Sequence, residues 1–137
     1  MIVSTRGRYA LRMMVDLSEH FGDGYVALKD VAKRQGISKK YLEQIIPVLN
    51  AASLLSTSRG FQGGYKLSRQ PENYTVGEIL RATEGAIAPV ACVAGDENDC
   101  PRKAQCPTLP LWQGLKSVVN EYLDGITLKD LVDKKLV

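Results

Sequence analysis

The chain has 137 residues, of which 45% are hydrophobic and 24% are charged. This composition is typical of a single globular domain, and no apolar run is long enough to span a membrane. Arg6, Arg8 and Arg12 leave no room for the apolar region of an export signal, so we expect a cytoplasmic protein without membrane contact.

The formal net charge of +3 is unevenly distributed along the chain. Residues 1–70 carry eleven Lys/Arg and five Asp/Glu, whereas residues 71–137 carry seven and ten. A basic N-terminal half and an acidic C-terminal half can arise by chance. They also fit a protein that turns only its first half toward a polyanion.

Apolar spacing and capping residues predict a mainly α-helical fold with one small β-hairpin. In chain order we expect helices from Ser4 or Thr5 to about His20, at 28–35 and at 39–52, a hairpin at 54–69, and helices at 75–84, 107–123 and from 127. Thr75 with Glu78, and Thr127 with Asp130, have the spacing of capping boxes. Pro47 removes a hydrogen bond within the third helix and predicts a kink or an end there.

Residues 28–50 have the pattern of a helix-turn-helix. Gly36 falls where the turn needs permissive backbone angles, and Ser38 is suited to cap the next helix. That helix separates an apolar arc from a polar arc of Lys39, Lys40, Glu43, Gln44 and Asn50. Such side chains can reach phosphates and base edges in the major groove, although any amphipathic surface helix also has a polar face.

The predicted hairpin adds a basic tip to this unit. Arg59 is flanked by Gly60, Gly63 and Gly64, so the turn is thin enough to enter a minor groove. The fold class is therefore a winged helix-turn-helix followed by a long C-terminal helix, for which dimerisation is one of two interpretations. We expect a DNA-binding domain at 1–84, a cysteine-rich sensor loop at 85–106, and the dimerisation and C-terminal helices at 107–137.

All three cysteines of the chain, Cys92, Cys100 and Cys106, lie within fifteen residues. The intervening segment is rich in acidic residues, glycine and proline, which predicts a polar loop whose thiols form a metal or redox site. The thiols are one ligand short of the four that zinc or a [2Fe–2S] cluster usually takes, and the spacing fits no zinc finger. A cluster, structural zinc, a clusterless thiol switch and inert thiols all remain open.

Four motifs in combination resemble a known family, and they extend over nearly the whole chain. They are Gly7-Arg8-Tyr9-Ala10, Gly36-Ile37-Ser38 with Tyr41-Leu42-Glu43-Gln44, Arg59-Gly60 with Gly63-Gly64-Tyr65, and Ile126-Thr127-Leu128. The family is that of the iron–sulfur cluster regulator IscR, whose winged-helix relatives include the nitric-oxide sensor NsrR and the cysteine-metabolism repressor CymR. The resemblance implies a dimeric transcription factor with Glu43 and Gln44 at base edges, Arg59 in the minor groove and a [2Fe–2S] cluster on the cysteine loop.

The expected DNA-contacting set is Ser38, Lys39, Lys40, Tyr41, Glu43, Gln44, Arg59 and Gly60. The expected metal ligands are Cys92, Cys100 and Cys106, with the fourth ligand of the cluster unassigned. The first cysteine gap is seven residues, where the cluster regulators have five. Leu109 stands where some members place a histidine, and Arg8 where the NsrR type places an aspartate. Asp96, Glu97, Asp99 and His20 are the remaining candidates.

The helix after the loop carries an apolar stripe at intervals of three, four and three residues, formed by Trp112, Leu115, Val119 and Tyr122. This stripe is either part of the core or a dimer interface. The resemblance places a dimerisation helix here, and single recognition helices rarely give enough specificity. We therefore expect a homodimer on a near-palindromic double-stranded operator.

Taken together, these patterns predict a dimeric, sequence-specific transcriptional regulator whose operator binding is controlled by a [2Fe–2S] cluster. By resemblance its targets are iron–sulfur cluster assembly genes. The alternatives are a clusterless thiol regulator of sulfur or cysteine metabolism, and a winged-helix protein–protein adaptor with structural zinc. We do not expect an enzyme, because the chain has one histidine, no phosphate-binding glycine loop and no Ser/His/Asp arrangement.

Overall fold

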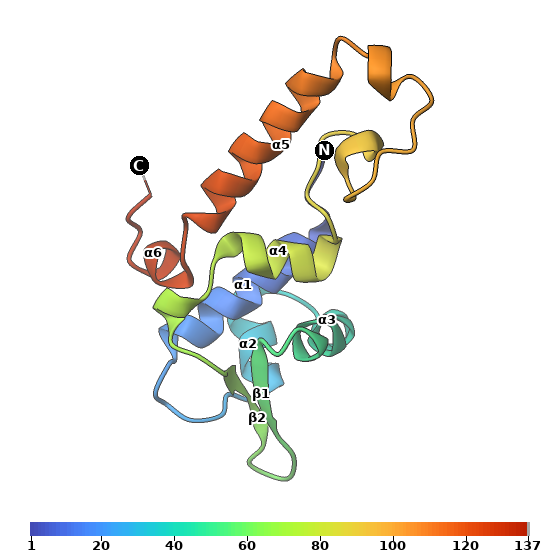
Figure 1. The fold of residues 1–137 in the computed structure, drawn as a ribbon. Helices are drawn as coiled ribbons and strands as arrows, with labels where there is room; N and C mark the ends of the chain where they lie inside the picture. Colours follow the sequence, from blue (N-terminus) through green and yellow to red (C-terminus); the bar gives the residue numbers. More distant parts are fainter. Residues whose placement is uncertain (137) are drawn as a thin grey trace.

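The computed structural model describes residues 1–136 and shows a mainly helical chain with one two-stranded antiparallel hairpin. The order is α1 (Thr5–Glu19), α2 (Leu28–Gln35), α3 (Lys39–Ala51), β1 (Leu55–Ser58), β2 (Gly64–Leu67), α4 (Val76–Glu84), α5 (Leu109–Asp124) and α6 (Leu128–Val132). Short 3-10 turns lie at Pro71–Asn73, Ala91–Val93 and Lys103–Gln105. In Figure 1, α1 to α4, α6 and the hairpin form one body, from which α5 and the loop before it project. None of the helices in this part of the chain is long and apolar enough to cross a membrane.

Helix α1 runs through the centre of this body. The Ser4 side chain accepts a hydrogen bond from the Gly7 backbone N–H and caps the helix, as its sequence position predicts. Ala10, Met13 and Met14 are completely buried in the core. The helix contacts α2, α3, α4, α6 and β2, so nearly every element packs on it.

The helix-turn-helix forms as predicted. Gly36 has φ of 63°, a left-handed conformation that glycine adopts without strain, and it ends α2. The Ser38 side chain accepts a hydrogen bond from the Tyr41 backbone N–H and caps α3. The helix does not end at Pro47, as one alternative predicted, but continues to Ala51. Leu42, Ile45 and Leu49 on its inner face are fully buried and hold it against the body on both sides of the proline.

A buried carboxylate joins α1 to α2. Asp16 is only 1% exposed, and its two oxygens accept hydrogen bonds from the Arg34 guanidinium at 2.7 and 3.0 Å. The Gln35 amide donates a third at 3.0 Å. Burial raises the pKa of this carboxyl, but the hydrogen bonds from Arg34 and Gln35 outweigh it, so the pKa of Asp16 lies below its usual value.

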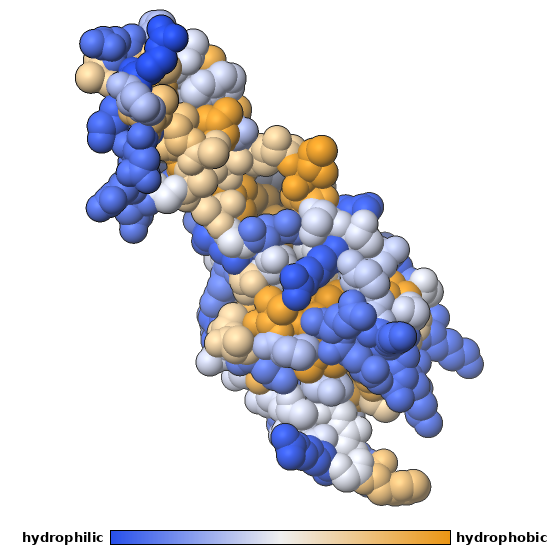
Figure 2. All heavy atoms as spheres, turned by 90° about the vertical axis from the view of Figure 1, so that its right-hand side faces the viewer, coloured by the Kyte–Doolittle hydropathy of each residue, from blue (hydrophilic) through white to orange (hydrophobic). Residues whose placement is uncertain are grey.

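Helix α5 has no buried residue along its 16-residue length. Its C-terminal half is held by α4, where the Arg81 guanidinium pairs with Asp124 and donates to the Asn120 Oδ1 at 3.0 Å. Val119 and Leu123 pack against a small apolar cluster that includes Leu80 of α4. The rest of α5 projects away from the body, and apolar side chains run along one side of this arm in Figure 2.

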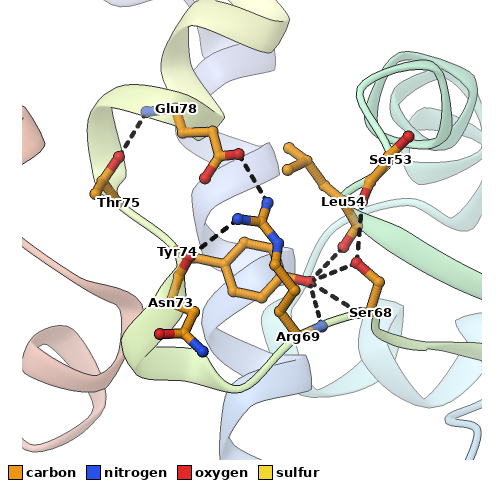
Figure 3. Close-up of polar contacts among 8 residues, drawn as sticks. All are labelled: Ser53, Leu54, Ser68, Arg69, Asn73, Tyr74, Thr75 and Glu78. Carbon is orange, nitrogen blue, oxygen red and sulfur yellow. Dashed lines mark hydrogen bonds and ion pairs between the residues drawn. The ribbon is translucent and has the colours of Figure 1, made fainter.

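The hairpin is anchored to the body by the phenol of Tyr74 (Figure 3). This residue is fully buried, and its hydroxyl donates to the Leu54 carbonyl at 2.7 Å. The same oxygen accepts from the backbone N–H groups of Ser68 at 2.8 Å and Arg69 at 3.1 Å. One side chain therefore bonds a buried carbonyl before β1 and two partly buried N–H groups after β2.

The Arg69 guanidinium stacks over the Tyr74 ring at 4.3 Å and pairs with the Glu78 carboxylate at 2.7 Å. The predicted capping box at Thr75 is therefore only half formed. The Thr75 hydroxyl accepts from the Glu78 backbone N–H, but the Glu78 side chain serves Arg69 instead. At the second predicted site, Thr127 and Asp130 form the complete box.

Replacement of Asp16 by asparagine should lower the free energy of unfolding by about 2 kcal/mol at pH 7, because a buried charged hydrogen-bond acceptor is lost. A carboxylate with a depressed pKa stabilises the folded state above its unfolded pKa of about 3.9, and this contribution disappears as the pH falls below that value. The free energy of unfolding, measured by urea denaturation, should therefore differ less between wild type and Asp16→Asn at pH 3 than at pH 7. A difference that stays constant over this range would contradict the ion-pair explanation.

Tyr74→Phe should destabilise the protein by about 2–3 kcal/mol, because the Leu54 carbonyl and two backbone N–H groups lose their shared partner with almost no change in volume. The measurement is urea denaturation followed by far-UV circular dichroism. Tyr25→Phe is the matched control, since Tyr25 is exposed, and it should be neutral.

Candidate nucleic-acid interface and cysteine loop

The outer face of α3 presents the polar set expected from the sequence. Lys39, Lys40, Glu43, Gln44 and Asn50 are all exposed, as is the capping residue Ser38. Tyr41 is half buried, and its ring meets the Tyr9 ring edge-on at 5.3 Å. Tyr41 therefore fixes α3 against α1, and only part of it is free to contact a ligand.

The hairpin projects beside α3 as a thin wing. Arg59 and Gly60 lie exposed in its turn. A side chain at position 63 would collide with the Ser58 carbonyl oxygen, because its Cβ would lie 2.3 Å from that atom. The backbone at Gly63 therefore lies close to the backbone at Ser58, and the turn between them is narrow. A two-residue bridge between Val26 and Tyr65, with N–H···O distances of 2.8 and 2.9 Å, ties the wing to the segment before α2.

An open cleft of about 420 Å³ separates α3 from the wing. Lys39 and Glu43 line it from α3, and Lys29 lines it from α2. Phe61 lines the opposite side and is fully exposed at the tip. Lys29 and Phe61 were not among the residues expected from the sequence. The position of Phe61 in the turn between Gly60 and Gly63 was the signal that could have identified it.

The three cysteines lie where expected, on the loop between α4 and α5, and all are free and partly buried. Cys92 sits in the 3-10 turn Ala91–Val93 and Cys106 follows the turn Lys103–Gln105. Within residues 1–136, no three Cys, His, Asp or Glu side chains come together as a metal-binding group. Thiols are the ligands that could fill three of the four protein positions of a [2Fe–2S] cluster. In the described residues, however, the three thiols do not come together, and no fourth ligand lies with them.

His20 is not placed to be that fourth ligand. It caps the C-terminal end of α1, and its Nδ1 lies 2.8 Å from the Asp16 carbonyl oxygen. In Figure 1 this end of α1 lies on the other side of the body from the cysteine loop. The loop carboxylates Asp96, Glu97 and Asp99 remain the nearer candidates in sequence.

The Cys106 thiol has a polar neighbour on the chain that follows it. A hydrogen bond with the Thr108 hydroxyl, at 3.3 Å, lowers the pKa of this thiol, and the Thr108 backbone and the Arg102 charge act in the same direction. A lowered pKa raises the fraction of thiolate, which is the form that binds metals and reacts with oxidants.

Asn120 connects the cysteine loop to both neighbouring helices. Its amide nitrogen donates to the Ile87 carbonyl at the start of the loop, at 2.9 Å, and its Oδ1 accepts from Arg81 of α4. A cleft of about 380 Å³ beside Asn120 is lined by Cys92 and by Lys116 of α5. A change at Cys92 is therefore adjacent to the contact between α4 and α5.

Only the C-terminal part of the apolar stripe of α5 contacts the core of the described chain, where Val119 packs against the cluster that includes Leu80. Leu115 and Tyr122 are exposed and Trp112 and Val119 only half buried. Leu111 and Val118 add further exposed apolar surface to the same helix. Burial within the described chain therefore accounts for Val119 but not for Leu115 and Tyr122, and the dimer interface stays a prediction.

The helix-turn-helix, the wing beside it and the long projecting helix define a winged-helix transcriptional regulator. A family model described as an iron-dependent transcriptional regulator, Rrf2, matches residues 3–134. The chain belongs to the Rrf2 family.

Several relatives of this chain are named as HTH-type transcriptional regulators. The protein rrf2 of Nitratidesulfovibrio vulgaris is 41% identical over 133 residues, which cover 96% of this chain and 87% of that protein. The structure of CymR, the global cysteine regulator of B. subtilis, aligns with a TM-score of 0.79 at 39% identity over 98% of both chains. T. potens IscR aligns with a TM-score of 0.77 at 40% identity, over 99% of this chain and 89% of that one.

If the stripe on α5 is a dimer interface, Tyr122→Glu should convert a dimer to a monomer, because it places a charge in an apolar contact. Tyr122 is 64% exposed, so the substitution should leave the chain folded. Sedimentation velocity at micromolar concentration measures the change. Phe21→Glu, at an exposed apolar residue outside α5, is the control and should stay dimeric; a wild-type monomer would contradict the interpretation.

Proposed function

We propose that this Rrf2-family regulator binds a near-palindromic double-stranded operator as a homodimer, with α3 in the major groove and the wing in the adjacent minor groove. The observation that carries the proposal is the exposed polar face of α3 beside a thin wing with Arg59 in its turn. Residues 1–84 form the DNA-binding unit, 85–106 the sensor loop and 107–137 the dimerisation part.

The proposed contacts follow from side-chain chemistry. Lys39 and Lys40 reach phosphate or guanine, Gln44 pairs with adenine, and Glu43 accepts from a cytosine amino group. Arg59 enters the minor groove, where narrow A·T-rich segments concentrate negative potential. Two such units, joined through α5, read half-sites about 34–36 Å apart or a multiple of that distance.

We further propose that the cysteine loop controls this binding. The loop leads from α4 of the DNA-binding unit to α5, and Asn120 bonds the start of the loop to both helices. Ordering or modification of the loop therefore changes how α5 sits on α4. In a dimer, that change alters the separation or tilt of the two reading units.

A [2Fe–2S] cluster is the first candidate for the loop's ligand. Cys92, Cys100 and Cys106 would hold it with a fourth ligand that is unassigned, and it would supply one-electron redox chemistry. The proposal is supported by the soft donor set and by the likeness to T. potens IscR.

A clusterless thiol switch is the second candidate, again controlling DNA binding. It is favoured by the separation of the three thiols in the described residues and by the likeness to the cysteine regulator CymR. The target genes would then be those of sulfur or cysteine metabolism, and not those of cluster assembly.

Arg59→Ala should weaken operator binding, because it removes a positive charge that lies near the DNA phosphates. It should also reduce the slope of log affinity against log salt concentration by about 1. Gln44→Ala should cost about 1–3 kcal/mol of binding free energy and relax one base preference. Fluorescence anisotropy with duplexes selected by the wild type, at several salt concentrations, measures both. Lys135→Ala removes an exposed charge near the C-terminus and should change neither quantity. A wild-type affinity that does not depend on salt would favour the protein–protein adaptor.

Replacement of all three cysteines by alanine should change operator affinity by about 5- to 150-fold, the usual range of allosteric coupling. The comparison uses anaerobically purified wild type and variant on the same selected duplexes. Ser117→Ala, on the exposed surface of α5 near the loop, is the control. Unchanged binding to every duplex tested would leave a constitutive DNA binder without a sensor.

A further inference from the structure

Phe61 at the tip of the wing is unlike the residues around it. Its side chain is 101% exposed, although phenylalanine is strongly apolar. In Figure 2 the lower end of the molecule, where Figure 1 places the hairpin turn, carries apolar atoms beside hydrophilic ones. A single exposed apolar side chain is common on protein surfaces, so exposure alone assigns no role.

Phe61 lies close to Arg59 and beside the cleft between the wing and α3. It follows Arg59 by two residues in the same turn and lines the cleft that faces Lys39 and Glu43 of α3. The ring is therefore on the side of the wing that faces the polar surface of α3. The narrow turn enforced at Gly63 carries both the guanidinium and the ring into any groove that the tip enters.

We propose that Phe61 is an apolar wedge that enters the minor groove beside Arg59 and makes the protein select a flexible base step there. The inference rests on the proposed DNA binding. Proteins that bind the minor groove often insert apolar side chains between base pairs and partly unstack them. Pyrimidine–purine steps unstack most easily, so a wedge reads sequence through deformability without a hydrogen bond to any base.

The two tip residues then have separable roles. Arg59 contributes through charge, so its contribution weakens with salt. Phe61 contributes through burial of apolar surface, which releases no counterions and leaves the salt dependence unchanged. This difference distinguishes a wedge from a residue that only positions the arginine.

The experiment selects duplexes from a random double-stranded library with the full-length protein under anaerobic conditions. Phe61→Ala should bind the wild-type-selected duplex about tenfold more weakly. It should also lose the enrichment of TA or CA/TG steps at the wing position, with the salt slope unchanged. Phe61→Leu keeps an apolar side chain and should retain most of the affinity and preference. Gln62→Ala, its exposed neighbour, should behave as wild type.

Two results would overturn the proposal while leaving DNA binding intact. One is a Phe61→Ala variant that selects the same sequences with the same affinity as the wild type. The other is a loss of affinity accompanied by a salt slope reduced by about 1, which would mean that the ring only positions Arg59. A wild-type protein that enriches no sequence would overturn the proposed DNA binding and this inference with it.

Discussion

The placement of the wing, which with α3 forms the proposed DNA-binding surface, depends on one buried hydroxyl. The Tyr74 phenol oxygen bonds the Leu54 carbonyl before β1 and two N–H groups after β2, and Tyr74 itself lies between the hairpin and α4. An isolated two-stranded hairpin is only marginally stable in water, so this anchor fixes the wing relative to α3. Arg69, stacked on the ring and paired with Glu78, extends the same anchor to α4.

Helix α4 therefore has two functions in the architecture. On one side it supports the wing through Glu78, and on the other it holds α5 and the start of the cysteine loop through Arg81 and Asn120. In the proposed mechanism, a rearrangement of the loop would act directly on α4, which contacts both α3 and α5. The α4–α5 contact combines a small apolar cluster with an ion pair that is partly exposed.

The helices and hairpin were predictable because their signals are local. Apolar periodicity, the caps at Ser4 and Ser38 and the left-handed Gly36 depend on neighbours in sequence. The partner of Glu78 was not predictable, because a capping box and an ion pair with Arg69 compete and only tertiary packing decides between them. The cysteine loop was located by composition alone. Its ligand set depends on long-range geometry. The cleft that Phe61 lines together with Lys39 and Glu43 likewise forms only in the folded chain, although the place of Phe61 in the turn is visible in the sequence.

We propose that the state of Cys92, Cys100 and Cys106 controls DNA binding. The most direct test is anaerobic purification with a visible spectrum and iron, sulfide and zinc analysis, followed by operator affinity before and after peroxide. We expect two irons and two sulfides per chain, visible absorption that is lost in Cys92→Ala, and an operator affinity that changes when peroxide destroys the cluster. A metal-free protein whose affinity still responds to peroxide would support the thiol switch. A metal-free protein with identical affinity before and after oxidation would contradict the claim.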